Sequence, residues 1–152
     1  MEAVTWRALI QQTWVLTLPA FPAVIYLPKP PTASVTSIAY IDTAGASQTL
    51  STDIYALDSR QEPARIVTKF GQVWPATRAQ NENAVTVTFV AGYGASASSV
   101  PEPLRHAVRL LAGMLYENRE AVAGGNVPLL PFALAAMLDA YSIRHPLLAQ
   151  YT

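Results

Sequence analysis

The sequence predicts an α+β fold, in which an antiparallel β-sheet or small β-sandwich forms the N-terminal half and two C-terminal α-helices pack together. Two patterns predict it. Residues 13–93 are rich in Val, Ile, Thr and Tyr, in short runs separated by Pro, Gly and Asp, as in antiparallel sheets. From residue 101 onward the apolar residues recur at helical spacing. With 152 residues, the chain has the length of a single domain.

Short runs of β-forming residues mark the predicted strands. The run at 83–92 is the clearest, because Val85, Val87 and Phe89 alternate with Thr86 and Thr88. Residues 34–50 predict a hairpin that turns at 42–45, where Asp and Gly favour a turn. The predicted strands are residues 13–18, 24–27, 34–42, 47–50, 54–57, 65–70 and 83–92.

Two helices are predicted after a linker of small residues at 95–99. Ser99 and Glu102 have the spacing of a capping box, and Pro101 suits a first turn. The apolar stripe of this helix comprises Leu104, Ala107, Val108, Leu111, Met114 and Leu115, and Gly124 ends it. A second helix begins at Pro131, presents Leu134, Met137, Leu138 and Tyr141 on one face, and ends before Pro146.

The single domain therefore divides into four parts. Residues 1–12 are predicted to be the end of an N-terminal helix whose beginning is missing. Residues 13–94 form the β-rich part, and residues 99–145 form the helical part. Residues 146–152 form an apolar C-terminal tail without a charged side chain, and such a tail usually finds a partner.

Charge is scarce in this chain. Ten basic residues balance ten acidic ones, which argues against electrostatic nucleic-acid binding over a large face. Charged residues make up 13% of the chain, about half the usual ~25%. The surface is therefore either that of an Ala-rich, well-packed domain or one that an assembly covers. Composition alone does not separate the two.

Targeting and thiol features are lacking in the sequence. The absence of cysteine excludes disulfide scaffolds, thiolate metal sites and cysteine nucleophiles. The first residues do not follow the pattern of a signal peptide, and prolines and glycines interrupt the longest uncharged stretch. We therefore expect a soluble protein that is made in the cytoplasm and does not enter a membrane.

The sequence does not favour catalysis. Ser98, His106 and Asp139 could be drawn as a triad, but no nucleophile elbow accompanies them, and a surface histidine is the favoured interpretation. Glu117 and Glu120 are better explained by a solvated face or by ion pairs with other subunits. We expect that the chain is not an enzyme and that it binds no metal and no cofactor. A hydrolase using His106 or Glu117 and a small-molecule or protein-binding α+β module without catalysis remain as alternatives.

A series of short motifs runs in order along nearly the whole chain. They are residues 7–10 (RALI), 12–14 (QTW), 21–22 (FP), 27–31 (LPKPP), 35–40 (VTSIAY), Asp42, Gly45, 48–50 (QTL), Tyr55, 74–75 (WP), 84–89 (AVTVTF), 92–94 (GYG), 100–101 (VP) and 116–120 (YENRE). Each motif is weak by itself, but their order resembles the head–tail connector (head-completion adaptor) family of long-tailed phages and prophages. Relative to that family, the resemblance implies a shortened N-terminal helical segment.

The resemblance implies a structural virion protein at the head–tail junction, assembled in the host cytoplasm. Such a protein forms a homo-oligomeric ring of about twelve copies, docks on the portal protein, extends the DNA channel and presents a surface to a neck or tail-completion protein. Passing DNA would be contacted non-specifically at most. The portal-binding residues are predicted at the C-terminus, namely Arg144, His145, Leu147, Leu148 and Tyr151. The predicted subunit or neck interface comprises Asp42, Gly45, Glu117, Arg119 and Glu120.

Overall fold

Two antiparallel sheets form the larger part of the molecule. The computed structural model describes residues 2–79, 81–117 and 132–143. A four-stranded sheet has the order β1 (Gln12–Leu18), β7 (Val85–Ala91), β3 (Thr32–Ile41) and β4 (Ser47–Thr49). A three-stranded sheet has the order β2 (Ile25–Tyr26), β6 (Arg65–Thr68) and β5 (Tyr55–Asp58). Each predicted strand is therefore present, within a few residues of its predicted bounds.

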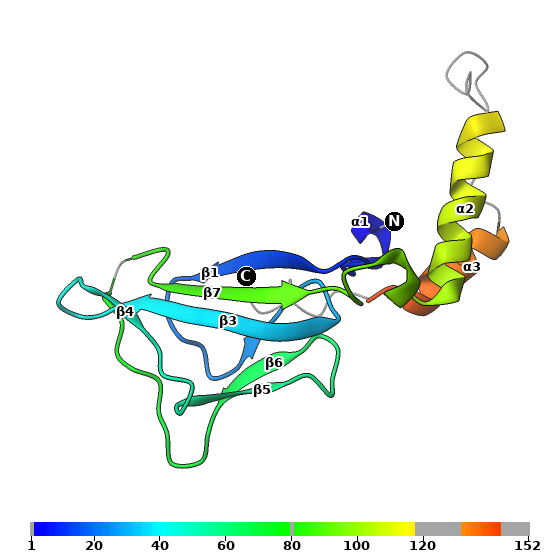
Figure 1. The fold of residues 1–152 in the computed structure, drawn as a ribbon. Helices are drawn as coiled ribbons and strands as arrows, with labels where there is room; N and C mark the ends of the chain where they lie inside the picture. Colours follow the sequence, from blue (N-terminus) through cyan, green and yellow to red (C-terminus); the bar gives the residue numbers. More distant parts are fainter. Residues whose placement is uncertain (1, 80, 118–131, 144–152) are drawn as a thin grey trace.

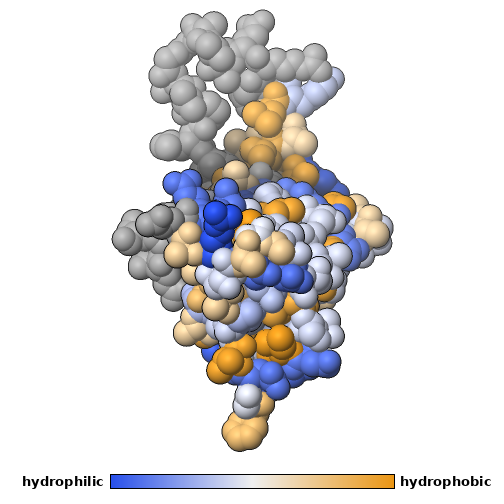
Figure 2. Space-filling view, turned by 90° about the vertical axis from the view of Figure 1, so that its left-hand side faces the viewer, coloured by the Kyte–Doolittle hydropathy of each residue, from blue (hydrophilic) through white to orange (hydrophobic). Residues whose placement is uncertain are grey.

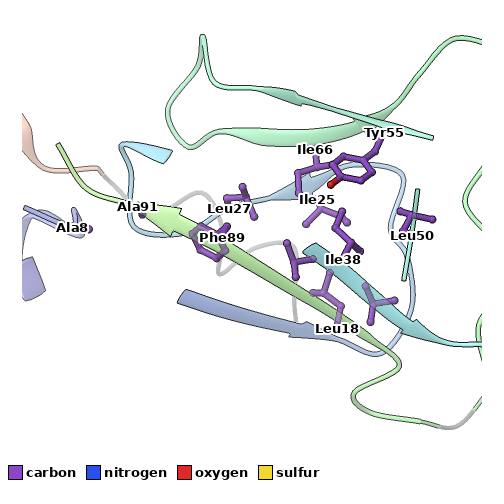
Figure 3. Packing of buried hydrophobic residues seen from close by; sticks show 12 residues of the cluster. Ala8, Leu18, Ile25, Leu27, Ile38, Leu50, Tyr55, Ile66, Phe89 and Ala91 are labelled. Carbon is purple, nitrogen blue, oxygen red and sulfur yellow. The ribbon is translucent and has the colours of Figure 1, made fainter. Parts of the chain in front are cut away.

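The two sheets enclose one apolar core. Of the two predicted architectures, an antiparallel sheet and a small β-sandwich, the structure therefore has the sandwich. Strand β7 lies between β1 and β3, and its side chains alternate as predicted: Val85, Val87 and Phe89 are buried, whereas Thr86 and Thr88 are half-buried on the other face. Figure 3 shows side chains from both sheets converging on this core. Its other fully buried members include Leu18, Ile25, Leu27, Ile38 and Ile66.

The helices form a second, smaller core at one end of the sandwich. In Figure 1, α2 (Glu102–Glu117) and α3 (Phe132–Tyr141) lie beyond the ends of β1 and β7, and α2 points away from the sheets. Leu104 and Ala107 of α2 are buried together with Leu134 and Leu138 of α3. The helices thus pack on each other as predicted, at one end of the sandwich and not on a sheet face. None of the helices in the described segments is long and apolar enough to span a membrane.

Two details of α2 differ from the prediction. Ser99 does not cap it: Ser99 ends a short 3₁₀ turn, η1 (Ala97–Ser99), and the carbonyl of Pro101 accepts the first backbone bond of α2, from Leu104 at 3.0 Å. The apolar stripe is also narrower than predicted. Val108 and Leu115 are exposed because α3 covers one side of α2 only.

The N-terminal segment is helical only at α1 (Glu2–Thr5), so the prediction of a helix through residue 12 was wrong. Trp6 has a φ of 57°, a left-handed conformation that ends the helix. Residues 8–11 then run without helical bonds, and with a bend at Leu9 and Ile10, between other segments. The amide of Ala8 donates to the carbonyl of Pro30 (3.1 Å), and the amide of Gln11 donates to that of Gly94 (2.9 Å). These bonds replace the helical ones.

Gly92 allows this segment to pass close to the end of β7. Its φ is +129°, and a β-carbon there would lie 2.5 Å from the carbonyl oxygen of Ile10 and 2.6 Å from Cα of Gln11. Both are backbone atoms, so no side chain can turn away to make room. The exit from β7 therefore requires glycine at this position.

We predict that Gly92→Ala destabilises the fold strongly. It combines a disfavoured φ with backbone overlap, so the loss should exceed about 2 kcal/mol. Gly71→Ala is the matched control: its φ is +75°, but nothing lies within 4 Å of the added carbon. The control should therefore lose only about 1 kcal/mol. Urea denaturation of both variants checks this, and equal losses would show that the close approach at Gly92 has no energetic weight.

Candidate protein-interaction site

Several apolar side chains of α2 are exposed. Val108 is 41% exposed, Leu110 42%, Leu115 65% and Tyr116 68%. By helical spacing Val108 and Leu115 continue the stripe of Leu104, which packs on α3, whereas Leu110 and Tyr116 lie on other sides of the helix. Figure 2 shows apolar residues gathered on the projecting helical part. Exposed apolar side chains that cluster on one element are typical of protein-interaction surfaces.

The charged residues of α2 lie in its first half and at its last position, Glu117. Glu102 forms ion pairs with Arg105 and with Arg109, the latter at 3.0 Å between Oε1 and a guanidinium nitrogen. From residue 110 to residue 116 the helix has no charged residue. A partner that covers this part of α2 therefore meets no charge that would have to be desolvated.

A hollow of about 310 Å³ lies beside the first turns of α2. It is open to the surface and mostly apolar, and Arg105 and Arg109 lie at its edge. The buried Nε of Arg105 has no hydrogen-bond partner among the described residues. The hollow can therefore receive an apolar side chain and, beside it, an acceptor such as a backbone carbonyl. Its lining residues are Leu9, Ile10, Ala97, Val100, Arg105, Val108 and Arg109.

The N-terminal segment fixes one wall of this hollow through Arg7. Its Nε donates to the carbonyl of Tyr141 at the end of α3 (2.6 Å), and its guanidinium pairs with Glu62 of the β5–β6 loop. Burial would lower the pKa of Arg7, but the hydrogen bond and charge of Glu62, with those of Tyr93, raise it. Arg7 therefore stays charged and joins the helices to the sandwich.

A second exposed apolar site lies in the loop between β6 and β7. The side chain of Phe70 is fully exposed and that of Val73 is 80% exposed. The loop forms the lowest point of the molecule in Figure 1, and an apolar residue projects at the same height in Figure 2. Beyond this tip, Trp74 turns inward and stacks on Phe21 with centroids 4.9 Å apart, as expected for a rim aromatic. The helical end and this loop are thus separate apolar sites.

Asp42 and Gly45, predicted at an interface, form the turn between β3 and β4. Oδ1 of Asp42 accepts from the amides of Ala44 and Ala46, both at 2.9 Å, and Oδ2 accepts from Nε2 of Gln48 at 3.0 Å. These bonds, that of Gln48 first, hold the pKa of Asp42 below its ordinary value of 3.8. The predicted hairpin is confirmed, and its Asp has the structural role that turns usually give it.

Of the remaining candidate residues, Ser98, His106 and Asp139 lie on separate elements. His106 is exposed on α2, and Oγ of Ser98 lies 2.7 Å from Oγ of Ser96. Asp139 lies on α3 and is exposed. Residues 2–79, 81–117 and 132–143 contain no group of three His, Cys, Asp or Glu that could hold a metal. Glu117 ends α2, but its side chain is not described. Outside the described residues lie Arg119, Glu120, Arg144, His145, Leu147, Leu148 and Tyr151.

Comparison with solved structures gives the strongest information on identity. A chain from the neck of an empty gene transfer agent particle, determined with C6 symmetry, is 31% identical with a TM-score of 0.75. The match covers 95% of this chain and 72% of that one. The chain belongs to the same family as this neck protein. A chain from the neck of a native particle, determined with C12 symmetry, is 29% identical (TM-score 0.75, covering 95% and 76%).

A chain from the virion of the native gene transfer agent particle is 28% identical with a TM-score of 0.73, and the match covers 95% of this chain and 72% of that one. No protein-family model and no curated protein matches the chain. The chain is therefore of the phage neck or connector type, as its motifs indicated. The specific adaptor role is taken up under the proposed function.

Sequence reasoning missed the apolar surface of this neck-type protein. It placed Val108 and Leu115 in the core and assigned no role to Trp6, Phe70 or Val73. A signal was present for the loop: Phe70 and Val73 flank Gly71 and Gln72, which interrupt the strand pattern. No comparable signal exists on α2, because helical spacing alone does not show how wide a stripe the second helix covers.

We predict a pH-dependent contribution from Asp42. Because its pKa is lowered in the folded state, its stabilising bonds are fully present above about pH 4 and are lost as pH falls through the folded pKa. Asp42→Ala should therefore lower the urea midpoint at pH 7, and its difference from the wild type should shrink in strong acid. A difference that stays constant down to the acid limit would contradict this.

Proposed function

We propose that the chain is a non-enzymatic head–tail connector (adaptor) subunit of a phage-like particle. Copies of the chain form a ring that docks on the portal vertex, extends the DNA channel and joins the head to the tail. The ring resides in the virion and is assembled in the host cytoplasm. Its partners are the portal protein, a neck or tail-completion protein and its own copies, and it uses no cofactor.

The observation that supports this proposal most is the match to neck structures along almost the whole chain. It covers 95% of the chain at 29% and 31% identity, so both the sandwich and the helical end have counterparts there. Those particles' necks were determined with C12 and C6 symmetry. A ring of about twelve copies, as the motifs imply, is compatible with either symmetry.

The surface of the chain suits a ring. Head-to-tail contacts in a ring use two different faces of each subunit. The helical end, with Val108, Leu115 and the hollow, and the loop with Phe70 are two such apolar sites in different parts of the molecule. Neither site relies on charge, in keeping with a charged fraction of 13%.

The alternative is that the hollow binds a small molecule, because its volume of about 310 Å³ is at the lower limit for small-molecule sites.

Electron microscopy of portal-bearing capsids tests the proposal. Purified chain mixed with capsids that lack a neck should add ring-shaped density at a single vertex. Leu115→Glu should reduce the occupied vertices by about tenfold or more, because it places an unpaired charge in an apolar interface.

Ser59→Glu is the matched control for that experiment. Ser59 is exposed in the β5–β6 loop and is not one of the residues that form either apolar site, so its variant should dock like the wild type. Absence of density with the folded wild-type chain would refute the connector role. Normal docking of Leu115→Glu would show that the exposed apolar part of α2 around Leu115 does not belong to the interface.

The C-terminal segment gives a separate prediction. Residues 147–152 contain Leu147, Leu148 and Tyr151 and no charge, so we assign them to portal binding. Deleting residues 147–152 should abolish portal binding. The midpoint of thermal unfolding should stay within a few degrees of the wild-type value, which corresponds to a change of about 1 kcal/mol in the free energy of unfolding. Pull-down with purified portal measures the first effect and circular dichroism the second. Binding retained by the deletion variant would refute this assignment.

A further inference from the structure

Strand β1 is the least protected sheet edge in the described part of the molecule. An edge strand exposes unpaired N–H and C=O groups, and proteins usually guard such edges with charges, prolines, bulges or short length. β1 has seven residues, Gln12–Leu18, and lies at the end of the order β1-β7-β3-β4. It contains no charged residue and no proline.

The other three sheet edges are guarded. β4 has three residues and β2 has two. β5 has four residues and ends in Asp58, which pairs with Arg65 (3.0 Å) and with Arg60 (3.3 Å). The part of β3 that β4 leaves uncovered contains two register shifts against β7. Among the four sheet edges of the described residues, β1 is therefore the one that lacks such protection.

β1 is also regular in its pairing. Its seven residues pair with β7 in unbroken register, from Gln12 opposite Ala91 to Leu18 opposite Val85. Its outward side chains are Thr13, Val15 and Thr17, and Val15 is 59% exposed. At about 3.3 Å per residue the open edge is ~23 Å long, enough for another extended segment to pair along it.

The charge pattern extends this observation to the whole sheet. Residues 8–28, 30–41, 43–52 and 83–101 contain no Asp, Glu, Lys or Arg. All four strands of the larger sheet fall within these stretches. A charged partner would meet no counter-charge on these strands, so the matching partner is an uncharged, extended segment.

We infer that β1 pairs through its main chain with an extended segment of a second copy of this chain. The inference rests on the proposed ring. In a ring every subunit has a neighbouring copy, so each β1 edge can pair with a segment of that neighbour. No β1 edge then stays open, and residues that guard the edge are unnecessary. This chain itself is rich in uncharged segments that suit the edge. The contact is therefore a strand-addition seam between neighbouring subunits.

Photo-crosslinking from position 15 tests the identity of the partner. The chain carrying benzoylphenylalanine in place of Val15 is assembled on portal-bearing capsids and irradiated. The expected product has twice the mass of the chain, with the cross-link from position 15 to another copy. The same probe at Thr52, an exposed turn residue, should give at least about fivefold less of this product. A cross-link from position 15 chiefly to the portal or another neck protein overturns the inference.

Lysines on the edge test the pairing itself. Val15→Lys and Thr17→Lys place charges on exposed positions, so both variants should fold, and they should reduce ring occupancy of vertices by about tenfold or more. Thr52→Lys makes the same chemical change away from the edge and should assemble normally. Normal rings from both β1 variants overturn the inference but leave the connector role intact. If the wild-type chain makes no ring at all, the connector role fails and the inference fails with it.

Discussion

The structure depends on the passage of residues 6–11 between the sandwich and the helices. This short segment contributes Ala8 to the sandwich core and Leu9 to the helical core, so both cores close around it. Main-chain bonds fix its path, since the carbonyl of Leu9 accepts from Tyr93 (3.3 Å) and that of Thr5 accepts from Ile143 (3.2 Å). Without it, the helical part would be joined to the sandwich by little more than the linker before α2.

This arrangement explains how a protruding helix can serve as a docking element. Arg7 connects the end of α3 with the β5–β6 loop, and its charge is satisfied on both sides. Ile10, from the same segment, forms part of the hollow beside α2. The apolar surface is therefore carried by groups that the two cores already hold in place, and little conformational entropy remains to be lost when a partner binds.

The sequence was sufficient to predict the strands but not to predict which apolar side chains are exposed. The alternation of Val85, Val87 and Phe89 with threonines reports burial on one face of a sheet, a local property. The exposure of Leu115 depends on how far α3 extends over α2, and the path of the chain after Trp6 depends on the bonds of Ala8 to Pro30 and of Gln11 to Gly94. Such tertiary effects override local propensity. The order of the motifs, by contrast, indicated the neck-type family, because the motifs are distributed over nearly the whole chain.

Low charge in a sequence has two physical explanations, and the structure separates them. If it reflected only a well-packed interior, the uncharged stretches would be buried. Instead, they form the larger sheet, whose outward residues include Thr13, Val15 and Thr17, while charges such as Asp58 and Arg65 are on the smaller sheet. An exposed, uncharged sheet with an open edge invites unspecific association unless a dedicated partner covers it. The distribution of charge therefore favours a subunit whose surface is completed by assembly.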